Sequence, residues 1–242
     1  MLNNLNITEF LKDTIIPPIC SVCGKICAEF LCQDCNTRIK FLDEAVCQYC
    51  GRLFTFKNNP GIKICSLCKN ENYSFYRLRS FSLYKEPIVN LILKFKYKKY
   101  YFLRKLLAGF LKKAYEKHFS SEKIDYIDTV PNYTADGQCG NYYNKSHMQI
   151  LAEDLSKIIR IPFLNNIIKI RDTSKQQKLD YYMRKINLND AFKVRNCLLS
   201  YGKNLLLIDD VWTTGSTLNE ISSILKKSKA NKIYLLTLAR GA

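Results

Sequence analysis

One thirteen-residue segment near the C-terminal end, residues 205–217, constrains the fold of this chain most strongly; it reads LLLIDDVWTTGST. Its four aliphatic residues predict a short strand buried inside a sheet. Two adjacent carboxylates, Asp209 and Asp210, follow where that strand is expected to end. A turn of small hydroxyl residues around one glycine comes next, and apolar residues then repeat at helical spacing. The segment therefore predicts a strand, an acidic pair, a loop and a helix in direct succession.

This order of elements suits a phosphorylated sugar. The start of a helix offers unpaired N–H groups and the positive end of the helix dipole, and both favour a phosphate. Gly215 lets the backbone approach the anion closely. The two carboxylates, one step earlier, are placed to accept hydrogen bonds from sugar hydroxyls or to lie near a divalent ion. The alternative is a buried strand followed by a Ser/Thr-capped helix that binds no ligand.

The segment resembles the motif with which type I phosphoribosyltransferases bind 5-phosphoribosyl-1-pyrophosphate (PRPP). The resemblance implies that Asp209 and Asp210 bind the ribose hydroxyls, and that the 5-phosphate is cradled by Thr213, Thr214, Gly215, Ser216 and Thr217. Trp212 departs from the motif, which usually has an aliphatic residue there. In the same family the loop after an earlier strand contacts pyrophosphate. Here that strand is expected at residues 124–131, so Pro131 joins the expected PRPP-binding residues.

Length and composition set broader limits. The 242 residues suit one medium domain plus a small module, and 47% apolar residues are enough for a core. The formal net charge of +17 favours polyanionic partners, although a lysine-rich composition also arises from a biased genome. The N-terminus lacks the features of a signal peptide, and no apolar run approaches the length of a membrane span. A cytoplasmic location is therefore expected, where thiols stay reduced.

Eight of the eleven cysteines form four C-x-x-C pairs: Cys20/Cys23, Cys32/Cys35, Cys47/Cys50 and Cys65/Cys68. Two thiolates at this spacing can hold one face of a tetrahedral metal, and two pairs complete a four-cysteine site. Sequential pairing is the simplest arrangement, and interleaved pairing stays open. We expect structural zinc, one or two ions, because a closed four-cysteine site leaves no coordination position for catalysis. An iron–sulfur cluster and a chance cluster of buried cysteines are the alternatives. Cys27 is expected to be a small buried residue, although it could substitute as a ligand.

A polar stretch at residues 69–74 marks a domain boundary. It predicts a zinc-ribbon module with a short N-terminal helix over residues 1–75, and an α/β domain over residues 76–242. Alternating strands and helices in the second part, with strands expected at 79–84, 124–131, 167–170, 205–208 and 232–238, predict a mostly parallel sheet. Ligands should gather at the carboxyl ends of its strands.

Residues 85–113 are strongly basic and predict two amphipathic helices broken near Tyr100. Tyrosines interleave there with four lysines, Lys94, Lys96, Lys98 and Lys99. Cations beside aromatic rings suit single-stranded nucleic acid, because its phosphates pair with the cations and its bases stack on the rings. The alternative is an ordinary solvated helix face. The two histidines, His118 and His147, are expected to have surface or packing roles.

The complete order resembles the ComF family, in which a cysteine-rich ribbon precedes a phosphoribosyltransferase-like domain. The residues that carry this resemblance are IIPPIC, LILKFKYKK, and a pattern formed by Arg171, Thr173, Gln176, Leu179, Arg184 and Asn187. One segment departs from the family: residues 141–145 read NYYNK where Arg-Gly-Phe-Asn-Gln is usual. The departure removes a cation and a glycine near the expected pyrophosphate loop.

The resemblance implies two functions. The first is an accessory protein of natural transformation that binds PRPP with Mg²⁺ and contacts single-stranded DNA on the cytoplasmic side, beside a competence helicase. The second is an active phosphoribosyltransferase with an unidentified acceptor. In that case Asp209 and Asp210 position the ribose, and cations of the loop at residues 171–187, Arg171 and Arg184 among them, offset charge on the pyrophosphate. Such a loop often closes over an active site.

Overall fold

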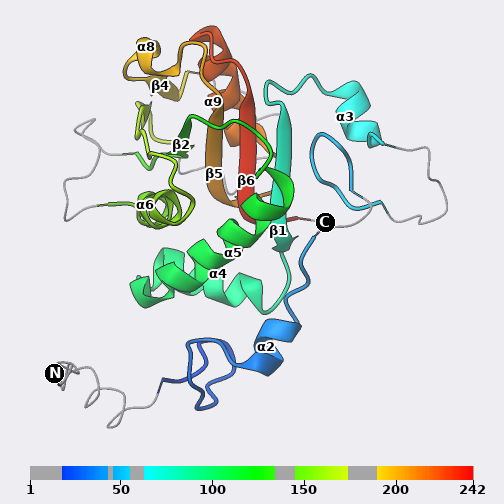
Figure 1. Cartoon of the computed structure of the whole chain (residues 1–242), viewed down its shortest axis with the longest axis vertical. Helices are drawn as coiled ribbons and strands as arrows, with labels where there is room; N and C mark the ends of the chain where they lie inside the picture. Colours follow the sequence, from blue (N-terminus) through cyan, green and yellow to red (C-terminus); the bar gives the residue numbers. More distant parts are fainter. Residues whose placement is uncertain (1–17, 43–45, 55–62, 134–144, 174–189, 242) are drawn as a thin grey trace, which may run out of the picture.

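The computed structural model describes residues 18–42, 46–54, 63–133, 145–173 and 190–241. At its centre is a four-stranded parallel sheet with the strand order β1-β6-β5-β2 (Figure 1). The strands are β1 (Arg77–Leu83), β2 (Tyr126–Thr129), β5 (Leu205–Trp212) and β6 (Ile233–Arg240). The predicted α/β class with a parallel sheet is confirmed.

Helices cover both faces of this sheet. One face packs against α4 (Ile88–Tyr97), α5 (Arg104–His118) and α6 (His147–Ile159), and the other against α9 (Ser216–Lys227). Side chains of β5 alternate between the two cores, because successive residues of a strand point to opposite faces. Leu206 and Ile208 join the core of α4 to α6, whereas Leu205 and Leu207 join the core of α9.

The two helices predicted within residues 85–113 and the helix predicted after residue 217 are present in the structure. A short 3₁₀ turn, η1 (Tyr101–Leu103), separates α4 from α5 where the break was expected. Leu218, Ile221 and Leu225 form the buried stripe of α9. In α6, Leu155 is buried, whereas Ile158, in the last turn of the helix, is 41% exposed. Every helix in the described part of the chain is too short or too polar to cross a lipid bilayer.

Strand β5 is longer than the aliphatic run that predicts it. The acidic pair does not follow the strand but lies within it, since β5 stays paired with β6 through Asp209 and Val211 as far as Trp212. On the other side, β2 ends at Thr129, opposite Ile208. The backbone of the two aspartates is therefore supported from one side while the other side is left open.

The cysteine-rich segment packs on two different parts of the domain (Figure 1). The part with α2 (Gln33–Thr37) lies below α4 and α5, and Cys20 and Cys35 belong to the same core as these helices. The part with α3 (Ser66–Asn70) lies beside β1, where the N–H of Leu78 donates to the carbonyl of Tyr49 at 2.7 Å. The linker between them also contacts β1, through the N–H of Leu42 and the carbonyl of Phe81 at 2.9 Å.

Two further elements complete the described chain. Strands β3 (Ile167–Lys169) and β4 (Phe192–Val194) form a separate antiparallel pair, and α8 (Cys197–Ser200) follows β4. The expected N-terminal helix, the 141–144 part of the departing segment and most of the expected closing loop lie outside the described residues. The domain division at residue 75 stays a prediction.

Candidate functional site

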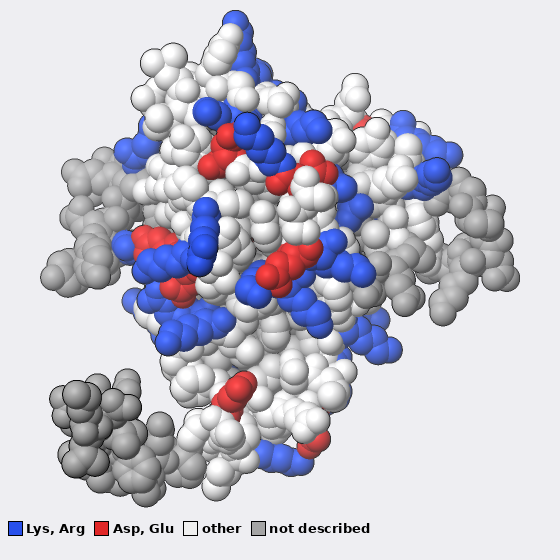
Figure 2. All heavy atoms as spheres, viewed as in Figure 1, with Lys and Arg blue, Asp and Glu red and all other residues white. Residues whose placement is uncertain are grey.

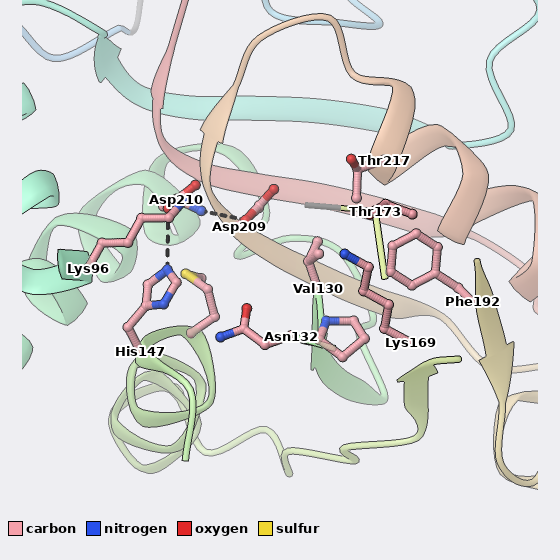
Figure 3. Close-up of a pocket in the computed structure, with 12 residues that line it drawn as sticks. Lys96, Val130, Asn132, His147, Lys169, Thr173, Phe192, Asp209, Asp210 and Thr217 are labelled. Carbon is pink, nitrogen blue, oxygen red and sulfur yellow. Dashed lines mark hydrogen bonds and ion pairs between the residues drawn. The ribbon is translucent and has the colours of Figure 1, made fainter. Parts of the chain in front are cut away.

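A pocket of about 200 Å³ opens beside the carboxyl ends of β2 and β5 (Figure 3). We call it the aspartate pocket. Four of the residues expected to bind PRPP line it: Asp209 and Asp210 from β5, Pro131 from the chain that leaves β2, and Thr217 from α9. β2 ends before β5 does, and residues 130–132, which follow β2, line the same pocket as the aspartates.

Two cationic or polar side chains from separate helices hold Asp210. The ammonium Nζ of Lys96, on α4, lies 2.6 Å from Oδ2 of Asp210, and Nε2 of His147, on α6, lies 3.3 Å from the same oxygen (Figure 3). Burial disfavours the charge of Asp210, but the hydrogen bond with His147 and the charge of Lys96 outweigh it and lower the pKa. Asp210 is therefore a fixed carboxylate.

Asp209 has the opposite tendency. Burial raises the pKa of Asp209, and the charge of Asp210 raises it further, because two adjacent carboxylates resist ionising together. Its Oδ1 accepts the backbone N–H of Asp210 at 2.9 Å. Carboxylate oxygens together with substrate phosphates are the ligands that Mg²⁺ prefers, so the donor set fits this ion. A bound cation would in turn favour the ionised form of Asp209.

The loop after β5 requires its glycine. Gly215 has a φ of +75°, and a Cβ atom there would lie 1.9 Å from the indole of Trp212. That indole is 4% exposed and packs edge-on against Phe75, with ring centroids 5.6 Å apart. Trp212, the residue that departs from the family motif, thus fills the space beneath the loop instead of facing the aspartate pocket.

The five loop residues do not all face the same cavity. Thr217 lines the aspartate pocket, whereas Thr213 and Thr214 line a second pocket. The hydroxyl of Thr214 lies 3.1 Å from that of Ser216, at the first turn of α9. The loop therefore forms a wall between two cavities, which the linear motif does not reveal.

Among the described residues, two lysines, Lys96 and Lys169, supply the Lys or Arg side chains that line the aspartate pocket. Lys96 was expected to contact nucleic acid, but its side chain points into the pocket, and Lys169 of β3 lines the opposite side (Figure 3). Burial lowers the pKa of Lys169. Arg171 is exposed and is not among the lining residues, whereas Thr173 is; Arg184 lies outside the described residues.

The two histidines differ from each other. His118 has the expected packing role, with Nε2 3.1 Å from the carbonyl oxygen of Leu42 and its ring beside Phe41. His147 also packs, with its ring centroid 6.1 Å from that of Phe95, but its imidazole lines the aspartate pocket as well, which was not expected. Sequence reasoning missed His147 and Lys169 because each is brought to the pocket by a different element. Their only signal is a position near the first turn of a helix or at the end of a strand.

The cysteines form two sites with sequential pairing. Each tetrad has its sulfur atoms within 4.8 Å of one another: Cys20, Cys23, Cys32 and Cys35 in the first, Cys47, Cys50, Cys65 and Cys68 in the second. The Sγ atoms of Cys23 and Cys32 lie 3.7 Å apart, and those of Cys50 and Cys65 3.6 Å apart. Tetrahedral zinc with bonds of about 2.3 Å separates its sulfurs by about 3.8 Å, so both tetrads fit structural zinc. Cys27 belongs to neither tetrad.

The predicted nucleic-acid lysines are split between the surface and internal contacts. Lys94 donates to the carbonyl of Ser21, and Lys96 holds Asp210. Lys98 and Lys99 are exposed beside Tyr97, which is 61% exposed. Figure 2 shows lysines and arginines spread over the face formed by α4 and α5, with acidic side chains among them. Phe102 and Phe30 of the first ribbon continue the aromatic surface, with centroids 4.5 Å apart.

Comparisons with known proteins address both parts of the chain. A family model described as a double zinc ribbon domain matches residues 11–70. Competence protein F of Haemophilus influenzae is 32% identical over 221 residues, which cover 87% of this chain and 90% of that protein. DNA utilization protein YhgH of Escherichia coli is 25% identical, covering 93% and 98%, and competence protein ComFC of Streptococcus pneumoniae is 22% identical, covering 87% of each.

Solved structures of phosphoribosyltransferases also match. Adenine phosphoribosyltransferase from Saccharomyces cerevisiae gives a TM-score of 0.38 at 18% identity, covering 60% of this chain and 72% of that one. The enzyme from Thermoanaerobacter pseudethanolicus gives 0.38 at 14% identity, covering 59% and 83%. Because these TM-scores are low, we assign the fold class from the parallel sheet of this chain and not from the matches.

Proposed function

This chain belongs to the ComF family of competence proteins, and on that basis we propose that it binds PRPP or a related phosphoribosyl ligand and acts in natural transformation. The ligand occupies the aspartate pocket together with Mg²⁺. Single-stranded DNA is contacted on the cytoplasmic side, and a competence helicase is a further partner.

The observation that carries the proposal is the pairing of Asp209 and Asp210 with the glycine loop at the start of α9. Carboxylates accept hydrogen bonds from the ribose hydroxyls, and the N–H groups of the first turn of α9 suit the 5-phosphate. Lys169 lies on the side of the pocket away from Lys96, where its charge would offset that of a pyrophosphate. Each part of the ligand thus has a group of matching chemistry.

The DNA contact rests on the exposed surface of α4 and η1. Lys98 and Lys99 offer charges, and Tyr97, Tyr100 and Phe102 offer exposed rings on which bases can stack. The aspartate pocket itself takes one side chain from the same helix, Lys96, which lies next to the exposed Tyr97 in the chain.

A second candidate is an active phosphoribosyltransferase, and Lys96 and Lys169 favour it. They supply cations to the pocket although residues 141–145 lack the usual arginine. In such a reaction the bond between C1 and the pyrophosphate oxygen breaks, its electron pair leaves with pyrophosphate, and the acceptor donates the pair for the new bond. Mg²⁺ would shield charge on the leaving group. Asp209 and Asp210 would hold the ribose while this happens.

Calorimetric titration of PRPP with Mg²⁺ tests the binding function. We expect the wild type to bind, Asp209→Asn/Asp210→Asn to bind at least tenfold more weakly, and Glu116→Gln, a surface control on α5, to match the wild type. Absence of binding by the folded wild type would overturn the proposal. A pyrophosphate-release assay with candidate acceptors then separates the candidates: release above the rate of the double variant supports a transferase, and binding without release supports a ligand sensor.

A further inference from the structure

The second pocket lies on the other side of the loop that follows β5. It has a volume of about 350 Å³, within the roughly 300–1,000 Å³ of small-ligand sites. We call it the ribbon pocket, because the second zinc ribbon and α3 form one wall with Cys50, Arg52 and Leu67. The loop residues Thr213 and Thr214 and the strand end at Arg240 form the other wall.

Two guanidinium groups line this pocket. Arg240 is 2% exposed, and it donates from Nη1 to the carbonyl of Cys50 and from Nε to the carbonyl of Gly241 at 3.3 Å. Nε of Arg52 is buried and has no hydrogen-bond partner among the described residues. One acidic residue, Glu71, also lines the pocket, so cationic groups outnumber acidic ones there. The buried guanidinium of Arg240 and the partly buried one of Arg52, beside two hydroxyls, match the oxygens of a phosphate group.

The remaining wall is aromatic and apolar. The rings of Tyr73 and Trp212 meet edge to face, with centroids 6.0 Å apart, and Leu67 lies beside them with 44% of its surface exposed. Aromatic side chains in a pocket wall offer a nucleobase apolar and edge-on contacts. The pocket thus combines a cationic half with an apolar half, as a ligand with one phosphate and one flat ring requires.

We propose that the ribbon pocket binds a 5′-nucleotide. Its phosphate lies between Arg52, Arg240 and the hydroxyls of Thr213 and Thr214, and its base packs against Tyr73 and Trp212. This site is separate from the aspartate pocket and does not depend on PRPP binding there. A free nucleoside monophosphate and the 5′-phosphorylated end of a DNA strand share this chemistry.

A purely structural role for the arginines makes a different prediction. Four thiolates around one zinc ion carry a net negative charge, and Arg52 and Arg240 could serve only to balance it. In that case removing Arg52 weakens zinc retention and leaves nucleotide binding unchanged. Zinc content must therefore be measured in every variant alongside binding.

The experiment measures binding of thymidine 5′-monophosphate by calorimetry, using full-length protein that carries zinc at both tetrads. We expect Arg52→Gln and Leu67→Trp each to weaken binding at least tenfold. The second variant blocks the pocket from a half-exposed position and changes no charge, so it decides the outcome if Arg52→Gln loses zinc. Arg160→Gln, an exposed arginine at the end of α6, and Asp209→Asn should bind as the wild type does.

Three results would overturn the proposal: no binding by the wild type, equal binding by Leu67→Trp, or loss of binding in Asp209→Asn, which would place the nucleotide in the aspartate pocket. A thymidine 12-mer labelled at its 3′ end, with and without a 5′-phosphate, then identifies the source. Tighter binding of the phosphorylated strand that is lost in Leu67→Trp supports a DNA end. Equal binding of the two strands, with the monophosphate still bound, supports a free nucleotide.

Discussion

Lys96 and Asp210 are 114 residues apart in the chain, yet Nζ of the lysine lies 2.6 Å from Oδ2 of the aspartate. The contact joins α4 to β5 and fixes the acidic pair of the site against a basic helix. One side chain of that helix therefore serves the pocket, while its neighbours Lys98 and Lys99 face solvent.

Replacing Lys96 should separate these two roles. In Lys96→Gln the carboxylate of Asp210 keeps, among the described residues, the contact with His147. We expect the free energy of unfolding to fall by about 1–2 kcal/mol, because the Lys96–Asp210 pair is partly exposed. We also expect weaker PRPP binding. Urea unfolding and calorimetry measure the two effects, with Lys98→Gln as the control that should change neither. Equal PRPP affinity of Lys96→Gln and Lys98→Gln would show that Lys96 does not contribute to PRPP binding.

Asp209→Asn should stabilise the protein while it weakens ligand binding. The pKa of Asp209 is raised in the folded state, so the wild type loses stability as the pH rises from the ordinary carboxyl pKa of 3.8 toward the raised one. Asparagine does not titrate, and the advantage of the variant should therefore grow over that range. Relief of about 1 kcal/mol corresponds to a melting temperature higher by about 2–4 °C. Melting curves between pH 4 and pH 8 check the sign; a constant difference would contradict it.

Gly215→Ala should cost more than the left-handed backbone alone explains. Gly202 has a similar φ of +68° but open space around it, so Gly202→Ala measures the backbone cost, about 1 kcal/mol. At Gly215 the added Cβ also meets the indole of Trp212, and we expect a loss of at least about 2 kcal/mol. Trp212→Leu should recover part of it, with a coupling above about 1 kcal/mol in the double-mutant cycle. If the two substitutions changed the free energy of unfolding additively, the indole of Trp212 would not be the cause of the extra loss in Gly215→Ala.

Zinc content should follow the two tetrads. Metal analysis of the wild type should give about two zinc ions per chain, and Cys50→Ser should retain about one. Cys27→Ser is the matched control, because Cys27 lies outside both tetrads, and it should retain both ions. Chelation should lower the melting temperature of the whole chain, since zinc binding contributes folding free energy. Two ions retained in Cys50→Ser would contradict the assignment.

Single-stranded DNA binding should depend on the two exposed lysines that directly follow α4, Lys98 and Lys99. Lys98→Gln/Lys99→Gln should weaken binding and reduce the slope of log affinity against log salt by about two, or one for each phosphate contact. Lys227→Gln/Lys229→Gln removes the same charge at the C-terminal end of α9, and it should leave the slope unchanged. Fluorescence anisotropy across a salt series measures both. Identical slopes for the two double variants would show that DNA binding depends on the net charge of the protein and not on Lys98 and Lys99.

Local sequence patterns predicted the features whose residues lie close together in the chain. The strand, loop and helix around residues 205–217 and the four cysteine pairs lie in short segments, so their spacing alone indicated their structure. The length of β5 did not follow in the same way. Its acidic residues end the apolar run, but β6 continues to pair with them, and a partner strand is invisible in a local pattern.

The rest of the site depends on contacts between distant elements. Lys96, His147 and Lys169 come from α4, α6 and β3, and only the packed sheet brings them to one cavity. The role of Trp212 was also hidden, because the motif shows only that an aliphatic residue is usual at this position and not that the side chain packs beneath Gly215. The ribbon pocket joins residues from the second cysteine tetrad to the last strand, so no motif contains it.

The hydrogen bonds from β1 to Tyr49 and from Leu42 back to β1 have a consequence for the protein without metal. β1 is the outermost strand of the sheet, and the cysteine-rich segment covers its free side. An uncovered edge strand is a template for pairing with another chain. Loss of zinc would therefore do more than unfold an appendage: it would expose a sheet edge, and the apoprotein should self-associate as its concentration rises.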